Sequence, residues 1–200
     1  MKIRHTIRLY GQTYTAVALA SVVLSPPVRH MLEKDMALHM LLQFSLLILV
    51  GVLLAGQVTS VGRASIARWN TYGIAGLGFV AIAAALGMVP RLLDLALVDL
   101  RVEWIKCVVL VICGLSLRLS WRQAGIVVQF FFLGNVLPMM AIAGSLYIET
   151  PQRLCNAYRL DEQLLVGQEL MWLAGGLGTL WLVHVGWKYS REDKELRLHS

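Results

Sequence analysis

Long apolar stretches alternate with short polar segments along almost the whole chain. A membrane-spanning helix needs about 20 mostly apolar residues, and stretches of roughly that length predict six helices. Their approximate ranges are 10–24, 36–56, 73–89, 104–119, 125–147 and 164–187. With their connections they occupy nearly all of the 200 residues. We therefore expect an all-α fold, a polytopic transmembrane helix bundle that forms one domain over residues 1–200.

The connections carry the helix-ending and charged residues. Pro26 and Pro27 are expected to end the first helix, and a charged loop follows from Arg29 to Asp35. Segment 57–72 is a polar connection, and segment 90–103 is expected to lie along the membrane surface. The basic N-terminus before an apolar stretch also has the form of a signal peptide. Because residues 25–27 (Ser-Pro-Pro) do not match the small-residue cleavage pattern, we keep this stretch as a helix.

The composition supports a membrane protein and excludes an ordinary soluble domain. The chain is 58% hydrophobic and 15% charged, whereas soluble domains carry about 25% charged residues. Such an apolar excess could not be buried inside a soluble domain of this size. A net charge of +6 would suggest nucleic acid in a soluble protein. Here the charges lie mainly in loops and tails, so we expect them to orient the bundle and expect no nucleic-acid partner.

Lysine and arginine are unequally distributed between the two predicted sides of the membrane. The more basic side belongs in the cytoplasm, which places both termini there and the protein in a bacterial inner membrane. The outer side then gathers most acidic residues and all the internal methionines. The residues of the basic side are Lys2, Arg4, Arg8, Arg63, Arg68, Arg118, Arg122, Lys188, Arg191, Lys194 and Arg197.

The densest group of candidate metal ligands lies at the expected outer end of the second helix. If that helix begins near Met36, then Met36, His39 and Met40 share one face. His30 and Met31 precede them on a loop that could fold over the helix end. Thioether and imidazole groups suit Cu(I), so these five residues predict a copper site. The alternative, methionine packing in an apolar core and histidine without a metal, stays open.

A second polar group precedes and enters the sixth helix. Glu169 lies inside its predicted boundary, and a carboxylate in a membrane helix usually faces a partner or a cavity. We expect Glu169 to pair with Lys106, to approach the second helix, or to be interfacial if the helix begins later. No nucleophile elbow, phosphate loop or HExxH motif occurs, so we predict no catalytic residues and no enzyme. The role of Cys155, in a polar loop, stays open.

Three short segments share a pattern with one protein family. They are residues 37–43 (Ala-Leu-His-Met-Leu-Leu-Gln), residues 88–90 (Met-Val-Pro) followed by an amphipathic loop and Trp104, and residues 161–163 (Asp-Glu-Gln) followed by Met171-Trp172 and Gly175-Gly176. They resemble the H-M-x-x-H segment, the following loop and the D-x-Q helix of the CtaG-like cytochrome c oxidase assembly family of bacterial membrane proteins. Gln43 stands where that family has its second histidine, and six spans are fewer than it usually has.

The resemblance implies a role in delivering or inserting copper during assembly of a haem–copper oxidase. It makes His39 and Met40 the candidate ligands, with Asp161, Gln163, Met171 and Trp172 as supporting positions beside Gln43 and Glu169. The prediction is therefore a Cu(I)-handling assembly factor or chaperone whose partners are the bilayer and a larger membrane redox enzyme. Two alternatives remain: an accessory subunit without its own metal, and a small transporter or electron-carrier subunit.

Overall fold

The structure, a computed structural model, describes the backbone of residues 2–198 and the side chains of residues 10–191. All regular elements in this part are helical, which confirms the all-α prediction. The side chains of Lys2, Arg4, Arg8, Lys194 and Arg197, which contribute to the predicted basic side, lie outside the described residues.

The helices follow one another with short connections. The first half contains α1 (Lys2–Leu24), α2 (Pro26–Leu32), the π-helix η1 (Leu38–Gln43), α3 (Phe44–Leu54), the 3-10 helix η2 (Ala55–Gln57) and α4 (Ser60–Trp69). The second half contains the 3-10 helix η3 (Thr71–Gly73), α5 (Ile74–Gly87), α6 (Pro90–Val98), α7 (Leu100–Trp121), α8 (Ile126–Glu149) and α9 (Leu160–Leu198). The six predicted helices correspond to α1, η1 to η2, α5, α7, α8 and α9, with α1 and α9 longer than predicted.

Two segments predicted as loops are helices. Pro26 and Pro27 do end α1, but they also begin α2, because proline suits the first positions of a helix and Ser25 precedes them as N-cap. In the polar connection, the hydroxyl of Thr59 accepts a hydrogen bond from the backbone N–H of Gly62 at 3.2 Å and caps α4. The chain bends by 70° between α1 and α2 and by 69° between α4 and α5.

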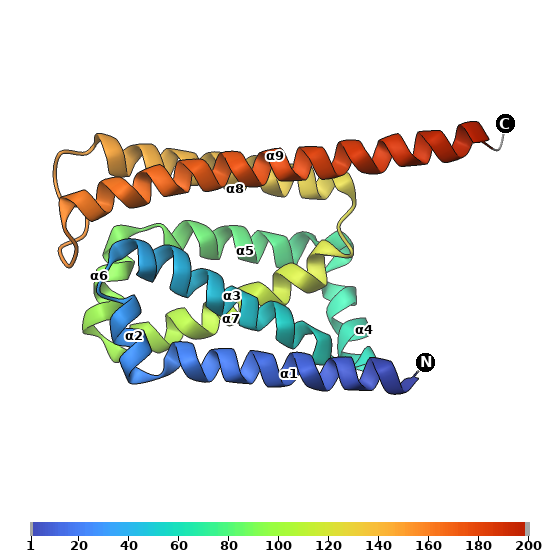
Figure 1. Ribbon diagram of the computed structural model, residues 1–200, viewed down its shortest axis with the longest axis horizontal. Coiled ribbons are helices and arrows are strands. Elements are labelled where there is room, and N and C mark those ends of the chain that lie inside the picture. Colours follow the sequence, from blue (N-terminus) through green and yellow to red (C-terminus); the bar gives the residue numbers. More distant parts are fainter. Residues whose placement is uncertain (1, 199–200) are drawn as a thin grey trace.

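The helices form layers that run along one long axis (Figure 1). α8 and α9 pack against each other as a hairpin on one side, α1 lies on the opposite side, and α3, α5 and α7 lie between them. The first and last described helices both reach the same end of the bundle, where α4 also lies. The opposite end carries α2, α6 and the loop between α8 and α9.

Close approach of the central helices depends on glycine. A Cβ atom added to Gly51 of α3 would lie 2.0 Å from a backbone carbonyl oxygen of α7, and one added to Gly114 of α7 would lie 1.9 Å from a carbonyl oxygen of α3. Gly144 of α8 and Gly167 of α9 face each other in the same way, with distances of 2.6 and 2.7 Å. Such small-residue contacts are typical of packing between membrane helices.

Several helices could cross a membrane by length and composition. Three do so alone, over Leu38–Gln57, Ile126–Glu149 and Leu160–Arg191, and the number rises to five if the bent pairs α1–α2 and α4–α5 each make one span. Many of their large apolar side chains point outward, such as Phe131, which is 70% exposed, and Trp172, which is 80% exposed. These features suggest a multi-pass membrane protein.

Candidate functional site

A buried polar network is centred on Lys106 of α7, near the end of the bundle that carries α2 and α6. The Lys106 ammonium lies 2.6 Å from Oε2 of Glu103, one turn earlier on the same helix. It also lies 2.7 Å from Nε2 of His39 and donates to Oε1 of Gln43 at 3.0 Å. An ammonium group has three donor hydrogens, so these three acceptors satisfy it completely.

The network continues through His39 to the loop between α8 and α9. Because the ammonium of Lys106 donates to Nε2, the proton of a neutral His39 ring belongs on Nδ1. Nδ1 lies 2.5 Å from the hydroxyl oxygen of Tyr158. The Tyr158 hydroxyl in turn donates to the backbone carbonyl of Glu33 at 3.2 Å. The hydrogen bonds therefore run in one direction, from Lys106 through His39 and Tyr158 to the residue that follows α2.

The members of this network other than Lys106, whose side chain is 12% exposed, are shielded from solvent. His39 and Gln43 are fully buried, and Glu103 is 2% exposed. Buried charges are costly unless they are paired and hydrogen-bonded, and Glu103 meets this condition through Lys106 and through the Cys107 thiol, which donates to its Oε1 at 3.4 Å. The side-chain amide nitrogen of Gln43 has no acceptor among the described atoms.

The local sequence explains why His39 and Gln43 face Lys106 together. Oδ1 of Asp35 accepts hydrogen bonds from the backbone N–H groups of Ala37 at 2.8 Å and Leu38 at 3.2 Å, which starts the helix there. The next turn is π-helical over Leu38–Gln43. A π turn is wider than an α turn and frequently occurs at functional sites. It places His39 and Gln43, four residues apart, on the side that faces α7.

Polar contacts hold the loop that brings Tyr158 to His39. A carboxylate oxygen of Asp94 in α6 accepts a hydrogen bond from the backbone N–H of Asn156 at 2.8 Å. From α9, the side chain of Gln163 accepts one from the backbone N–H of Leu154, also at 2.8 Å. Segment 150–159 has no helix or strand, so these side chains replace the missing backbone partners. The loop is therefore fixed on both sides of Cys155.

Burial controls the protonation of the groups in and beside this loop. It raises the pKa of Tyr158 well above its ordinary value, with smaller contributions from the charge of Glu33 and other acidic groups. Burial, assisted by the Asp94 carboxylate, raises the pKa of the Cys155 thiol to about 12. Both side chains are therefore protonated at neutral pH, as the Tyr158 donor role requires. Burial also raises the pKa of Glu33, and the charge of Glu103 adds to this effect.

The structure divides the five residues predicted to bind Cu(I) into two exposed and three buried side chains. Segment 26–32 forms α2 instead of a loop over the helix end, which leaves His30 exposed and Met31 65% exposed. Met36, His39 and Met40 are buried. Both ring nitrogens of His39 are engaged, one of them by an ammonium that would repel a cation. Within the described part, no three His, Cys, Asp or Glu side chains are arranged to hold a metal.

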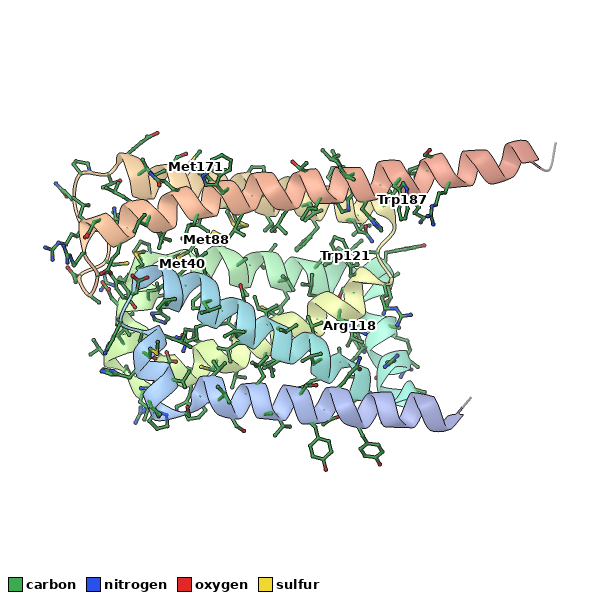
Figure 2. All side chains as sticks on the ribbon, in the orientation of Figure 1. Met40, Met88, Arg118, Trp121, Met171 and Trp187 are labelled. Atoms are coloured by element: carbon green, nitrogen blue, oxygen red, sulfur yellow. The ribbon has the colours of Figure 1, made fainter. Side chains whose placement is uncertain are left out.

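A different set of sulfur-bearing residues does converge. Met36, Met40 and Cys155 are buried in one apolar cluster, against which Met88 and Met140 also pack. We name these five residues the sulfur cluster. Met40 and Met88 lie at one end of the bundle and Arg118 at the other (Figure 2). The sequence indicated methionine enrichment at this end, but the inclusion of Cys155 depends on the fold of its loop.

The predicted supporting residues have divergent roles. Gln43 belongs to the network of Lys106, and Gln163 acts on the loop as described above. Asp161 is exposed and pairs with Arg159 at 3.1 Å. The other three lie on the outside of α9: Glu169 is exposed, Met171 is 44% exposed and Trp172 is 80% exposed.

The expected pair between Glu169 and Lys106 is not formed. Lys106 pairs with Glu103 on its own helix instead, and Glu169 lines a shallow apolar groove with Trp172. The sequence reasoning overlooked Glu103 and Tyr158 as members of the network. A signal for the pair was present, since Glu103 and Lys106 are three residues apart at the start of an apolar helix. No local pattern pointed to Tyr158.

No family model matches the chain, and no curated protein or solved structure is significantly similar to it. The residues of the network therefore carry the functional argument by themselves.

Proposed function

We propose that this chain is a bacterial inner-membrane protein with six spans, both termini in the cytoplasm, and a proton-binding site near its outer end. In addition to the five candidate spans described above, we count α7 as a span, because its stretch from Cys107 to Leu117 is apolar. Mutual neutralisation of Glu103 and Lys106 makes their position near the start of this span acceptable. Both ends of the described chain reach one end of the bundle (Figure 1), and the lysine and arginine distribution favours the cytoplasm for that end.

One observation carries the functional part of the proposal, namely the unbroken contact of four titratable side chains from Glu103 through Lys106 and His39 to Tyr158. Ionisable residues inside membrane proteins are expensive and usually serve ion or proton pathways. A proton added to this row of four side chains must alter the Glu103–Lys106 pair or the neutral state of His39. Either change redistributes hydrogen bonds as far as Tyr158, so the loop and α3 would respond to protonation together.

The network occupies one end of the bundle, which favours proton exchange with the outer side over a continuous path across the membrane. Towards the other end, α3 and α7 approach each other closely at Gly51 and Gly114. We therefore infer a proton-coupled transporter or subunit, without catalysis of its own, that works with a larger membrane redox enzyme. The bilayer is its immediate environment.

Infrared difference spectra of the protein in nanodiscs, recorded between acidic and alkaline pH, test the proposal. We expect a carboxyl band that Glu103→Gln removes and that His39→Gln shifts in frequency, because both side chains contact the Lys106 ammonium. Glu149→Gln is the matched control, because Glu149 is an exposed carboxylate at the end of α8. Identical spectra for the wild type and Glu103→Gln would contradict the proposal.

A second candidate function is Cu(I) handling, and the sulfur cluster favours it. Thioether and thiolate ligands suit Cu(I), and Met36, Met40 and Cys155 converge from two separate segments. In this version His39 is a neighbour of the metal rather than a ligand. The cluster also has an ordinary interpretation, since methionine fills apolar cores well. Copper handling would agree with the role in oxidase assembly that the sequence resemblance implies.

Cu(I) affinity under reducing conditions, measured by competition with a chromogenic chelator, separates the two interpretations. We expect the Met36→Leu/Met40→Leu double variant and Cys155→Ser to lose copper, while leucine preserves the apolar packing. Met31→Leu is the control, because Met31 is 65% exposed outside the cluster. Equal copper retention in all four proteins would exclude the sulfur cluster as a metal site.

A further inference from the structure

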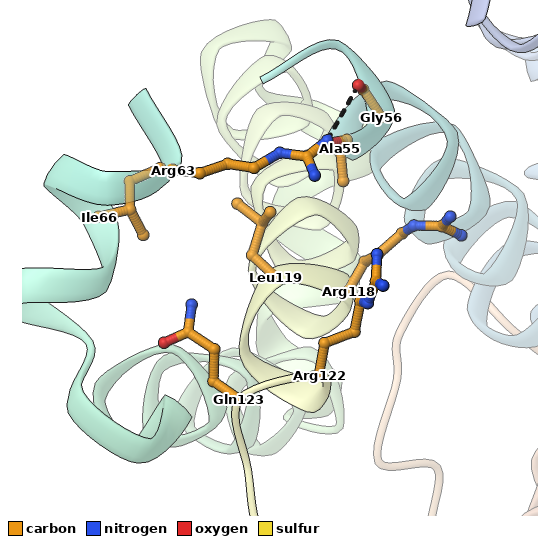
Figure 3. Close-up of a pocket in the computed structure, with 8 residues that line it drawn as sticks. All are labelled: Ala55, Gly56, Arg63, Ile66, Arg118, Leu119, Arg122 and Gln123. Carbon is orange, nitrogen blue, oxygen red and sulfur yellow. Dashed lines mark hydrogen bonds between the residues drawn. The ribbon is translucent and has the colours of Figure 1, made fainter. Parts of the chain in front are cut away.

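A basic pocket lies at the end of the bundle opposite the network. It has a volume of about 250 Å³ and is enclosed by η2, α4 and the end of α7. Arg63 lines it from α4, Arg118 from the last turn of α7, and Arg122 and Gln123 from the turn that follows α7. Figure 3 shows Arg63 extending towards Gly56 on one side of Leu119, with Arg118 and Arg122 on the other.

Arg63 is held in place by backbone carbonyl groups. Its Nε donates to the carbonyl of Val58 at 2.9 Å, and one terminal nitrogen donates to the carbonyl of Gly56 at 3.1 Å. These bonds orient the guanidinium, and no described carboxylate forms an ion pair with it. The geometry is therefore preorganised, which reduces the entropic cost of binding an anion.

Carboxylates are absent from the elements that form the pocket. The sequence has no Asp or Glu from position 36 to 93 or from 104 to 148, ranges that include η2, α4 and the end of α7. Arg118 and Arg122 make no ion pair with any described residue. The three guanidinium groups that line the pocket therefore have no neutralising acid among the described residues. An anion supplied from outside the chain would provide the missing counter-charge.

The position of the pocket and its walls indicate the kind of anion. Arg118 and Trp121 lie at the same end of the bundle (Figure 2), and tryptophan is enriched where membrane helices meet the interface. Guanidinium groups bind phosphate oxygens in bidentate geometry. The apolar side chains of Ile66 and Leu119 also line the pocket and suit the carbon backbone of a lipid better than a fully hydrated ion.

We propose that Arg63, Arg118 and Arg122 form a phosphate-binding site that takes the headgroup phosphate of an anionic phospholipid from the leaflet at this end. Basic pockets between membrane helices on the cytoplasmic side bind such headgroups in other proteins. Free inorganic phosphate has the same charged group and is the other source that the site would accept. The site is independent of the proton-binding network and of the sulfur cluster.

Native mass spectrometry of the detergent-purified full chain tests this assignment with phosphatidylglycerol as ligand and phosphatidylcholine as the neutral comparison. We expect preferential retention of phosphatidylglycerol, weakened about thirtyfold by Arg118→Gln/Arg122→Gln, since each arginine near an anionic surface contributes about fivefold. Arg68→Gln is the matched control, because Arg68 is on α4, is exposed like the pocket arginines and does not line the pocket. Arg118→Lys/Arg122→Lys keeps the positive charges and should keep most of the preference for phosphatidylglycerol over phosphatidylcholine.

A parallel thermal-unfolding series with inorganic phosphate against chloride distinguishes the two sources. Stabilisation by phosphate that needs Arg118 and Arg122, without preferential lipid retention, would identify free phosphate as the occupant and support the site. Failure of both ligands to show a dependence on these arginines would overturn the proposal, as would an equal loss in Arg68→Gln. The lysine double variant keeps the test valid if the glutamine double variant fails to fold.

Discussion

The hydroxyl of Tyr158 lies 2.5 Å from Nδ1 of His39, although the two residues are 119 positions apart in the sequence. Tyr158 belongs to the loop between α8 and α9, and His39 to η1, which leads directly into α3. The contact therefore ties the α8–α9 hairpin to the part of the bundle that holds Glu103 and Lys106. Movement of the loop and the hydrogen bonding of His39 are coupled by this one bond.

Tyr158→Phe is expected to lower the melting temperature. It removes the hydroxyl and leaves the buried Nδ1–H of His39 without an acceptor, which costs about 1–3 kcal/mol. Circular dichroism melts of the detergent-solubilised protein measure the effect. Tyr14→Phe is the control, since Tyr14 is 77% exposed on α1. Equal melting temperatures for the two variants would show that the Tyr158–His39 contact contributes nothing to stability.

Lys106→Met should destabilise the protein strongly. Glu103 is 2% exposed, and removing one partner of a buried ion pair typically costs about 3–5 kcal/mol because the other charge stays buried. Glu103→Gln/Lys106→Met should recover part of this loss, since no charge is left unpaired.

Arg159→Ala provides the comparison for the Lys106 variant in the same unfolding assay. The Arg159–Asp161 pair has 74% and 63% of its side-chain surface exposed, and exposed pairs contribute about 0–1 kcal/mol. A loss for Lys106→Met no larger than for Arg159→Ala would mean that water reaches Glu103.

The helical fold could be predicted from the sequence, because long apolar runs indicate helices that face lipid or the core. It was insufficient at Pro26 and Pro27, where the same residues end one helix and begin the next. Helix propensity and capping act locally, so α4 was also predictable in principle from Thr59 and the ten residues after it. The polar composition of that segment masked it.

The site was less predictable, because it depends on contacts between distant segments. His39 was identified as a candidate ligand, but the sequence did not indicate that the ammonium of Lys106 lies 2.7 Å from its ring. Three distant segments meet there, and sequence spacing contains no information about such a meeting. Met31 shows that closeness in sequence also does not ensure closeness in the fold. It is a neighbour of Met36 in sequence, yet α2 directs it to the surface.

Alkylation of Cys155 is expected to be slow at neutral pH. The thiolate is the reactive form, and a pKa of about 12 keeps nearly all of this thiol protonated. The rate should rise about tenfold per pH unit up to that value, because the thiolate fraction does so. Mass spectrometry of maleimide labelling in a Cys107→Ser/Cys113→Ser background gives the rate for Cys155 alone.

Asp94→Ala should accelerate the labelling of Cys155 for two reasons. The Asp94 carboxylate helps to raise the thiol pKa, and it holds the backbone of Asn156 next to the thiol. Asp161→Ala removes an exposed carboxylate that pairs with Arg159 at the end of the loop rather than with the backbone beside Cys155, and it should leave the rate unchanged. Rates that are equal in the two variants would show that Asp94 does not hold the loop closed.

Gly114→Ala tests whether the α3–α7 contact supports the whole bundle. The added methyl group would lie 1.9 Å from a backbone oxygen of α3, and a backbone atom cannot move aside as a flexible side chain can. The helices must separate, and overpacking of this kind typically destabilises a folded protein by about 1–3 kcal/mol or more.

Gly175→Ala is the matched control, because nothing lies within 4 Å of its added methyl group. Alanine there should stabilise α9 by about 1 kcal/mol through helix propensity. Opposite changes in melting temperature for the two variants are therefore expected, and a stabilising effect of Gly114→Ala would refute the close approach of α3 and α7.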